Sequence, residues 1–203
     1  MQVSQFDDNI SALFYDIDTN QIFVFLENRD CYVVILGDAE TSRSYLDKVT
    51  GTKKPKCCKF KDKLFVASGE HLQYYDYGVL ETKLQMITDA PVCDNLFYRW
   101  GRLMVTRSGS DRITYSAVGD ATSDEAWVEN TNDTSMSLWL DIGSDDSGDI
   151  TDVVPLATDI IVFKSNGTAY QFMGDKSVDT WVVYNGANFT DLTGDFTAGM
   201  AAT

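Results

Sequence analysis

Ile22-Phe23-Val24 is followed by a polar turn, by Tyr32 and by Gly37-Asp38, and this arrangement recurs three more times along the chain. The other copies are Leu64-Phe65-Val66 with Tyr74 and Gly78, Leu103-Met104-Val105 with Tyr115 and Gly119-Asp120, and Ile160-Ile161-Val162 with Tyr170 and Gly174-Asp175. The Val positions lie 42, 39 and 57 residues apart. A period near forty, built from strand-like units, is typical of the blades of a β-propeller.

Each copy predicts a set of antiparallel strands. A short apolar segment and a polar turn precede every Leu/Ile–apolar–Val strand, a second polar turn follows it, and the Tyr lies on the next strand. In the last copy the second turn contains Asn166-Gly167, a pair that suits a type I′ hairpin. A fourth, weaker strand is expected in each copy, at Tyr45–Val49, at Leu84–Ile87, within Trp127–Leu140 and at Thr180–Tyr184. Four antiparallel strands make one propeller blade.

The Leu/Ile–apolar–Val strands are continuously apolar, which favours strands covered on both faces, as when blades stack on one another. We therefore predict an all-β, propeller-like array of about four blades in a single domain over residues 1–203, with repeats at about 10–50, 55–90, 93–140 and 150–187. Residues 188–203 are predicted to be a loose tail. The alternative is a β-sandwich built of hairpins. Such a short array must close or have its ends covered, by further blades or by neighbouring chains.

Charge restricts the partners. The chain has 31 acidic and 16 basic residues, a net charge of −15. This balance argues against electrostatic gripping of nucleic acid, which needs a basic patch. It favours either simple solubility or a surface that DNA passes without adhering, because like charges repel.

The cysteine and histidine content argues against a zinc site. The cysteines are Cys31, Cys57, Cys58 and Cys93, without a C-x-x-C spacing, and His71 is the only histidine. We expect four reduced thiols in a protein made in a cytosolic compartment. The polar, acidic first residues do not resemble a signal peptide, and no apolar run is long enough for a membrane-spanning helix.

Two acidic segments offer oxygen ligands for a cation: Asp16–Asn20, and the cluster Asp141, Asp145, Asp146, Asp149 and Asp152, for which a solvated loop is favoured. Asp16-x-Asp18-x-Asn20 has the oxygen spacing that opens a calcium loop but lacks the later Gly and Glu, so a turn with Asx hydrogen bonds is favoured. Ser144-x-Asp146-x-Gly148 matches the core of the Asp-box hairpin of sialidase-like propellers, although Thr151 replaces the expected Trp. No catalytic constellation is recognisable, so we predict neither enzymatic activity nor a cofactor or metal site.

The third gap is longer than the others by some fifteen residues, within Ala121–Gly148. Its Asn, Asp, Thr and Ser content predicts an exposed insertion loop, with a short strand at Ser137–Leu140 inside it, that the core of the blade does not require. Long loops often make contacts. The predicted interface residues are Trp127, Leu138, Trp139, Asp145 and Asp146.

Two stretches carry a resemblance to a known family. One is Leu96–Thr106 followed by Arg112-Ile-Thr-Tyr-Ser-Ala-Val-Gly-Asp120 and Trp127; the other is Asp141-Ile-Gly143, Asp149-Ile150, Val154-Pro-Leu156, Asp159–Lys164 and Gly167–Asp175. Over about 96–175 the chain resembles the propeller blades of phage tail nozzle proteins, the tail tubular protein B group of short-tailed phages. Members are typically much longer than this chain.

The resemblance implies a structural virion protein, a nozzle or hub made in the bacterial host and placed in the phage tail. It implies a homo-oligomeric ring that contacts a head–tail adaptor or portal-side protein and other tail proteins, and that forms part of the DNA-ejection channel. DNA would pass without specific binding, and no membrane span is expected. The alternative function is a carbohydrate- or receptor-binding β-propeller module.

Overall fold

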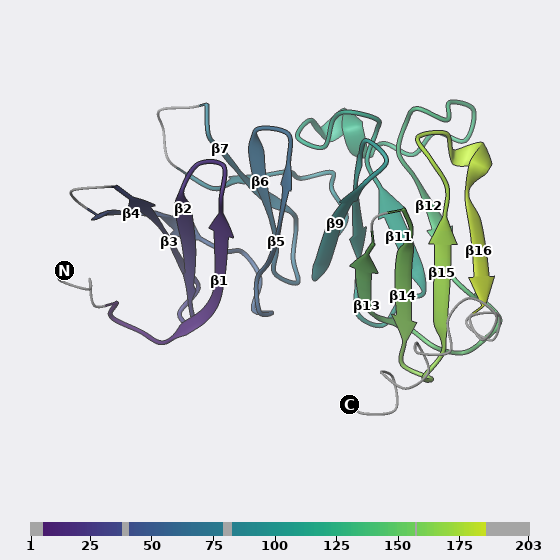
Figure 1. The fold of residues 1–203 in the computed structure, drawn as a ribbon, viewed down its shortest axis with the longest axis horizontal. Coiled ribbons are helices and arrows are strands. Elements are labelled where there is room, and N and C mark those ends of the chain that lie inside the picture. The colour runs from purple at the N-terminus through teal and green to yellow at the C-terminus, as the bar shows by residue number, and fades with distance from the viewer. Residues whose placement is uncertain (1–5, 38–40, 79–82, 157, 186–203) are drawn as a thin grey trace.

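Sixteen β-strands form four separate antiparallel sheets in the computed structural model, which describes residues 6–37, 41–78, 83–156 and 158–185 (Figure 1). The strands of the first two sheets are β1 (Ile10–Asp16), β2 (Gln21–Leu26), β3 (Asp30–Leu36), β4 (Thr41–Lys48), β5 (Lys56–Phe60), β6 (Lys63–Ala67), β7 (Gln73–Asp76) and β8 (Gln85–Met86). Those of the last two are β9 (Asn95–Arg99), β10 (Arg102–Thr106), β11 (Arg112–Tyr115), β12 (Leu138–Asp141), β13 (Ile150–Pro155), β14 (Ile160–Lys164), β15 (Ala169–Met173) and β16 (Val182–Asn185).

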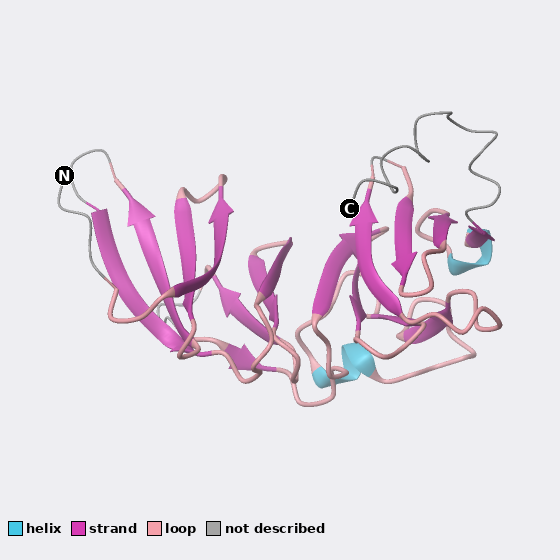
Figure 2. Ribbon diagram, turned by 90° about the horizontal axis from the view of Figure 1, so that it is seen from below, coloured by secondary structure: helices cyan, strands magenta, loops and turns pink. Residues whose placement is uncertain are grey.

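Each sheet is a simple meander of four consecutive strands, which we call blades 1 to 4 in chain order. Two short 3₁₀ helices, η1 (Asp124–Trp127) and η2 (Val178–Thr180), are the only helices in the described part of the chain. The blades follow one another along an open arc, with blade 1 at one end and blade 4 at the other (Figures 1 and 2). The predicted all-β, propeller-like array of four-stranded blades is confirmed.

The fourth strands lie close to their predicted places. They are β4, β8, β12 and β16, and β12 lies inside the segment 121–148 that the sequence suggested to be an insertion. That segment is therefore partly the outer strand of blade 3 and is required by the blade, which corrects the expectation of a dispensable loop. The predicted tail 188–203 lies outside the described residues.

In blades 2 and 3, the side chains of the second strand alternate between the two neighbouring blades, which explains the continuous apolar character of these strands. In β6, Leu64 and Val66 lie in a buried cluster with Phe23 and Phe25 of blade 1. The intervening Phe65 belongs to a different cluster, shared with blade 3. We call the face of a blade that points to its predecessor the leading face, and the opposite face the trailing face.

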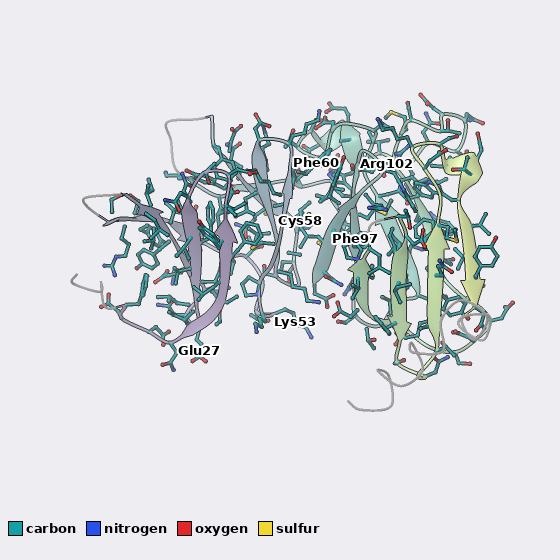
Figure 3. The ribbon with its side chains drawn as sticks, in the orientation of Figure 1. Glu27, Lys53, Cys58, Phe60, Phe97 and Arg102 are labelled. Carbon is teal, nitrogen blue, oxygen red and sulfur yellow. The ribbon has the colours of Figure 1, made fainter. Side chains whose placement is uncertain are left out.

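The four motif valines occupy equivalent positions on these leading faces. Val66 packs on blade 1, Val105 on blade 2 and Val162 on blade 3, while Val24 lies on the leading face of blade 1. All four are buried. Figure 3 shows the side chains between blades, with Cys58 and Phe60 on β5 and Phe97 on β9. The core is thus a series of layers between sheets.

The motif tyrosines all lie on the third strands, as predicted, but they are not equivalent. Tyr32 pairs with Val24 and Tyr170 with Val162, on the leading faces. In blade 2, Gln73 is opposite Val66, and in blade 3, Thr114 is opposite Val105. A shift of one residue turns a strand side chain to the other face, so Tyr74 and Tyr115 point to the following blade.

The hydrogen bonds of Gln73 give a physical reason for the shift in blade 2. Its buried side chain accepts a hydrogen bond from the Thr50 backbone N–H at 2.9 Å and donates one to the Lys48 carbonyl at 3.2 Å. These groups belong to the connection that leaves blade 1. An amide satisfies this buried backbone, which a tyrosine ring at the same position would not do.

We expect Val105→Asp to lower the free energy of unfolding by about 3 kcal/mol or more, because it places an unpaired carboxylate between blades 2 and 3. Val118→Asp adds the same charge at a side chain that is 44% exposed and should change stability by less than about 0.5 kcal/mol. Chemical denaturation of both variants measures the difference. Equal stability of the two variants would contradict the assigned register.

Candidate functional site

The predicted interface residues of segment 121–148 lie in two different settings. Trp127, at the end of η1, is buried in the cluster between blades 2 and 3, and its indole N–H donates to the Ala121 carbonyl at 3.1 Å. Leu138 and Trp139 lie on β12, opposite Tyr115 and Thr114, and are half-buried. Trp127 is therefore a core residue of this chain, while β12 leaves part of Leu138 and Trp139 available for contact.

Trp139 is covered by a cation. The Arg112 guanidinium lies 3.6 Å from the centroid of the indole ring, and Arg112 Nε donates to Asp141 Oδ1 at 2.9 Å. These contacts join the ends of β11 and β12. The Asp141 carboxylate is the main cause of a raised pKa of Arg112, so the guanidinium is held in its charged form.

A second arginine is enclosed where this segment returns to blade 3. The Arg102 side chain, labelled in Figure 3, is fully buried and forms no salt bridge within the described part of the chain, although the Asp133 carboxylate acts on it electrostatically. Its guanidinium donates to the carbonyls of Ser116 at 2.6 Å and Met136 at 2.9 Å, and also to that of Thr134. The ring of Tyr115 lies 5.0 Å away. Burial lowers the pKa of Arg102, and carbonyl oxygens take the place of water around Nη1 and Nη2, while the buried Nε has no hydrogen-bond partner among the described residues.

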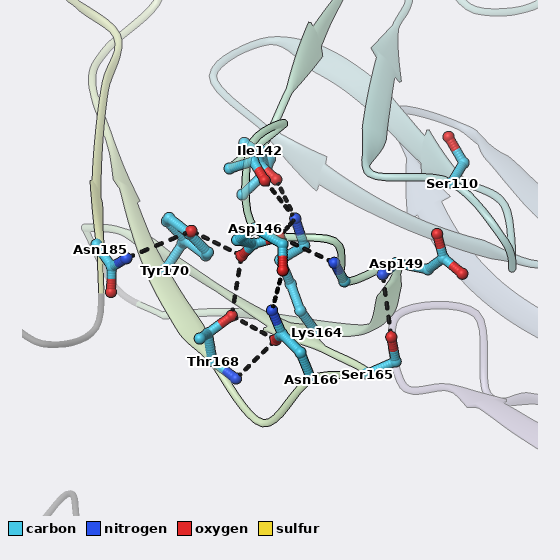
Figure 4. Close-up of polar contacts among 12 residues, drawn as sticks. Ser110, Ile142, Asp146, Asp149, Lys164, Ser165, Asn166, Thr168, Tyr170 and Asn185 are labelled. Carbon is cyan, nitrogen blue, oxygen red and sulfur yellow. Dashed lines mark hydrogen bonds and ion pairs between the residues drawn. The ribbon is translucent and has the colours of Figure 1, made fainter.

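The acidic loop before blade 4 is closed around a buried lysine (Figure 4). The Lys164 ammonium, at the end of β14, donates to the carbonyls of Ile142 and Gly143 at 2.6 and 2.9 Å and to Asp146 Oδ1 at 2.5 Å. The Lys164 side chain is inaccessible to solvent. Each of the three N–H groups of this buried ammonium has a hydrogen-bond acceptor. These bonds fix the loop 142–146 to β14.

Asp146 is the centre of this network. Besides Lys164, it accepts hydrogen bonds from the Gly148 N–H at 3.0 Å, the Thr168 hydroxyl at 3.1 Å and the Tyr170 hydroxyl at 2.7 Å. Burial alone would raise the pKa of this carboxyl, but the hydrogen bonds, led by that from Lys164, lower it well below its usual range. Burial and the bond to Asp146 raise the pKa of Tyr170 to about 12.

The loop also requires a glycine. Gly143 has φ +60, and a Cβ there would lie 2.3 Å from the Tyr170 hydroxyl oxygen. Both the backbone conformation and the space exclude a side chain. The Ser144-x-Asp146-x-Gly148 pattern is thus an internal clamp on blade 4, while the neighbouring Asp145 is exposed. The Asp146 carboxylate and the Lys164 ammonium are occupied by each other and by their neighbours, so the geometry of the clamp positions the loop.

Sequence reasoning identified Asp146 but missed its partners Lys164 and Tyr170, and it missed Arg102. A weak signal was present: Lys164 and Arg102 stand at the two ends of otherwise apolar second strands, where they are buried with them. A cation in such a position needs acceptors nearby. The sequence does not show which carbonyls supply them.

Asp16-x-Asp18-x-Asn20 is a turn with Asx hydrogen bonds, as the sequence favoured. Asp16 Oδ1 accepts from the Asp18 N–H at 3.1 Å, and the Lys59 ammonium lies 3.0 Å from Asp16 and 2.9 Å from Asp18. This ammonium comes from β5, so the contact links blades 1 and 2 in the place where a cation would be expected. No group of three or more metal-ligating side chains occurs among the described residues.

All four cysteines are free thiols. Burial raises the pKa of Cys31, Cys57, Cys58 and Cys93, so each thiol is held protonated. In the described part of the chain no helix is long and apolar enough to cross a membrane.

Two grooves lie beside the blades. The larger, about 550 Å³, runs along the β10–β11 turn of blade 3 and includes Arg107, Ser108, Arg112, Trp127 and Glu129. The smaller, about 360 Å³, lies between the first strands of blades 1, 2 and 3 and includes Leu13, Phe14, Lys54, Lys56 and Asn95. The Lys56 ammonium there is 2.9 Å from Asp152 of blade 4, which also accepts from the Asn95 amide at 3.0 Å. Three blades are therefore joined on the inner side of the arc.

No family model and no curated protein matches the chain. Its fold is similar to those of solved β-propeller proteins at low sequence identity. The extracellular domain of the putative hybrid two-component system BT4673 from B. thetaiotaomicron has a TM-score of 0.61 and 10% identity over 91% of this chain. PorZ of Porphyromonas gingivalis, described as a surface component of the type-IX secretion system, has a TM-score of 0.59 and 12% identity over 89% of the chain.

YCF48 bound to a D1 peptide has a TM-score of 0.53 and 12% identity over 83% of the chain. The chain spans only 23%, 22% and 51% of the lengths of these three neighbours, respectively. Identities this low show a shared fold and carry no function from one protein to another.

We expect shortening of 130–135 to destabilise the monomer by about 1–3 kcal/mol, because it removes the Thr134 carbonyl from the buried Arg102 guanidinium. The same deletion should cost less in an Arg102→Met background, since there is no charge left to solvate. Denaturation of the four proteins of this cycle gives the coupling. Additive effects would show that the loop does not stabilise Arg102.

The Asp16–Lys59 pair predicts a pH dependence of stability. Burial by itself raises the pKa of Asp16, but the hydrogen bonds, led by that from Lys59, lower it to about 2. A lowered folded-state pKa adds stability above the unfolded-state pKa near 4, and this contribution, about 2 kcal/mol, is lost as the pH falls from about 4 towards 2. At neutral pH, the free energy of unfolding of Asp16→Asn should be lower than that of the unaltered protein. Between about pH 4 and 2 it should change less with pH than that of the unaltered protein.

Asp18→Asn is the matched control for this pH effect. The Asp18 side chain is 71% exposed, so its pairing with Lys59 should contribute less than about 1 kcal/mol. Denaturation at several pH values compares the three proteins. A pH profile of Asp16→Asn identical to that of the unaltered protein would contradict the assignment.

Proposed function

We propose that the chain is a non-enzymatic structural protein of a phage tail, a nozzle or hub component that forms part of a ring around the DNA-ejection channel. The observation that carries the proposal is that the stretch 96–175, which resembles nozzle proteins in sequence, builds two blades and a loop fixed by buried charges. These residues form the strands of blades 3 and 4 up to β15 and the loop between the two blades. Asp146 of that loop accepts a hydrogen bond from Lys164 at the end of β14, and this ion pair holds the loop against the strand.

The assembly role is supported by the polar clamps. Arg102, Asp146 and Lys164 fix the outer loops of blades 3 and 4 with buried charges. Such fixed loops present a constant surface to neighbouring proteins, which suits a part of a large assembly better than an adaptable binding loop. The exposed portion of this surface includes Asp145 and parts of Leu138 and Trp139.

The net charge of −15 supports the channel role. An acidic wall repels the phosphates of a duplex, so DNA moves past it without binding. The tail proteins that would adjoin it are a head–tail adaptor or portal-side protein and further tail subunits.

The alternative function is recognition of a carbohydrate or another receptor. The groove of about 550 Å³ on blade 3 is the observation that favours it, because it places Arg107 and serine hydroxyl groups in a concave surface. A glycan array separates the two functions. Specific glycan binding that is abolished by Arg107→Ala would favour the alternative.

If the proposal is correct, quantitative mass spectrometry of purified phage particles should find the chain in a fixed, multiple copy number. Particles assembled without it should fail to retain or deliver DNA. Adding a variant with Leu138→Asp and Trp139→Asp should restore function less well than adding the Val118→Asp control. Absence of the chain from intact, infectious particles would overturn the proposal.

A further inference from the structure

Blade 2 covers only part of the leading face of blade 3. Val105 is opposite Thr114, which is in turn opposite Trp139, so these three side chains share that face. Arg112 and Asp141 are opposite each other two residues further along, on the same face. Val105 is buried against blade 2, but β8, the outer strand of blade 2, has only two residues. The side chains beyond Val105 are therefore half-buried, and the groove of about 550 Å³ lies beside them.

Arg107 is a cation in this groove whose charge is not paired. It follows the last residue of β10, and Arg112 is the first residue of β11, so the two arginines stand at the two ends of one turn. Arg112 donates to Asp141 at 2.9 Å. Arg107 is exposed, and its side chain has no hydrogen bond or ion pair with any residue that the structure describes. A guanidinium presents its N–H donors in a planar fork that matches the two oxygens of a carboxylate.

The turn that carries Arg107 is held from two sides. The Ser108 N–H donates to the Asp94 carboxylate at 3.1 Å, and the Ser108 hydroxyl donates to the same group. On the other side, the Ser110 carbonyl accepts from the Ile150 N–H at 2.8 Å. The backbone next to the unpaired guanidinium is thus fixed before any ligand arrives, which lowers the entropy lost on binding.

The remaining charges of the groove restrict the ligand. Asp89 and Glu129 also line it, so a ligand with several acidic groups would be repelled. The net charge of −15 acts in the same direction over the whole chain. The ligand that fits this arrangement has one carboxylate for Arg107 and uncharged polar groups on either side of it.

The aromatic residues of this region favour a peptide over a sugar. Trp127 is only 5% exposed, and the Arg112 guanidinium lies 3.6 Å from the centroid of the Trp139 ring. The groove therefore has little free aromatic surface on which a sugar ring could stack. A peptide does not need such a surface, because its backbone amides can bond with the Ser110 and Thr114 hydroxyl groups that line the groove.

We propose that this groove binds an extended peptide segment of a neighbouring protein, in which one Asp or Glu side chain, set among uncharged polar residues, pairs with the Arg107 guanidinium. The inference rests on the assembly role proposed above. It specifies a second contact surface, on the face of blade 3 that blade 2 leaves open, and the chemistry of the partner that the surface selects.

An array of short peptides of random sequence, probed with the labelled full chain, tests this preference. We expect the bound peptides to be enriched in sequences with a single Asp or Glu and depleted in sequences with several acidic residues. Arg107→Glu should abolish the enrichment. Lys176→Glu is the matched control, because it makes the same change of charge at an exposed lysine after β15 of blade 4, outside the groove. It should leave the enrichment unchanged.

Titration of the best peptide by fluorescence anisotropy measures the charge pairing itself. The analogue with Gln or Asn in place of the acid should bind at least about threefold more weakly, and Arg107→Glu should weaken binding of the acidic peptide by about tenfold or more. Added salt should weaken binding further, since it screens the pair. An analogue with Lys in place of the acid should prefer Arg107→Glu to the unaltered chain, a reversal that altered folding alone would not produce.

A photo-cross-linking residue in place of Glu129, which lines the groove, extends the test to assembled particles. We expect a cross-link to a peptide of another protein with one acidic residue near the linked site, and its loss when Arg107→Glu is added. Circular dichroism and thermal melting check that the variants fold, which is expected because both Arg107 and Glu129 are exposed.

The inference would be overturned by an array without acidic enrichment, by an enrichment that Arg107→Glu leaves intact, or by selective binding of a glycan in the groove. None of these results depends on the presence of the chain in particles, because they are obtained with the isolated protein. Absence of the chain from particles would instead overturn the tail role and leave the peptide preference standing.

Discussion

The burial of the second strand of a blade against the neighbouring sheets, on both faces in blades 2 and 3, is the constraint on which the rest of the structure depends. In β6 the side chains alternate between blades 1 and 3, with Leu64 and Val66 on one side and Phe65 on the other. A sheet covered on both faces buries twice the apolar surface of a sheet exposed on one side, so each blade is stabilised mainly by its neighbours. Among the described residues, the first and last blades each have one face without a neighbouring blade.

Polar contacts add order to this apolar stack. Lys59 joins blades 1 and 2 through Asp16, and Lys56 reaches Asp152 of blade 4 beside Asn95 of blade 3. Such contacts contribute less to stability than apolar burial does, because the buried Asp16 must be desolvated and the half-exposed Lys56–Asp152 pair is screened by water. Their directional geometry instead fixes how far one blade can turn relative to the next, which an apolar interface alone does not specify.

The outer loops of blades 3 and 4 show buried charge used for positioning. Arg102 is solvated by carbonyls, and Lys164 by two carbonyls and the Asp146 carboxylate. Both cations lie at ends of second strands, so the strand that carries the core also holds the loop. This fixation of the loops by the core strands is consistent with the proposed role in assembly, because an assembly protein needs its contact loops in one conformation.

The sequence by itself determined the fold class, the four blades and the equivalence of the valines. It could do so because burial on both faces requires continuous apolar runs, and these recur at a nearly constant spacing. It also indicated that Asp16-x-Asp18-x-Asn20 is a turn. It did not show that Tyr74 and Tyr115 point to the trailing faces of their blades, whereas Tyr32 and Tyr170 point to the leading faces. That difference depends on the strand register, which turn geometry sets.

The sequence also placed a fourth strand within Trp127–Leu140, but only the tertiary structure decided that Trp127 itself is buried in the core. It alone paired Asp146 with Lys164 and placed Arg102 against the Thr134 carbonyl. The Arg102 contact joins groups 32 residues apart through a backbone carbonyl, which every residue possesses and which therefore leaves no mark in the sequence. Asp146 and Lys164 are 18 residues apart, and only the fold shows which of the many carboxylates meets this ammonium.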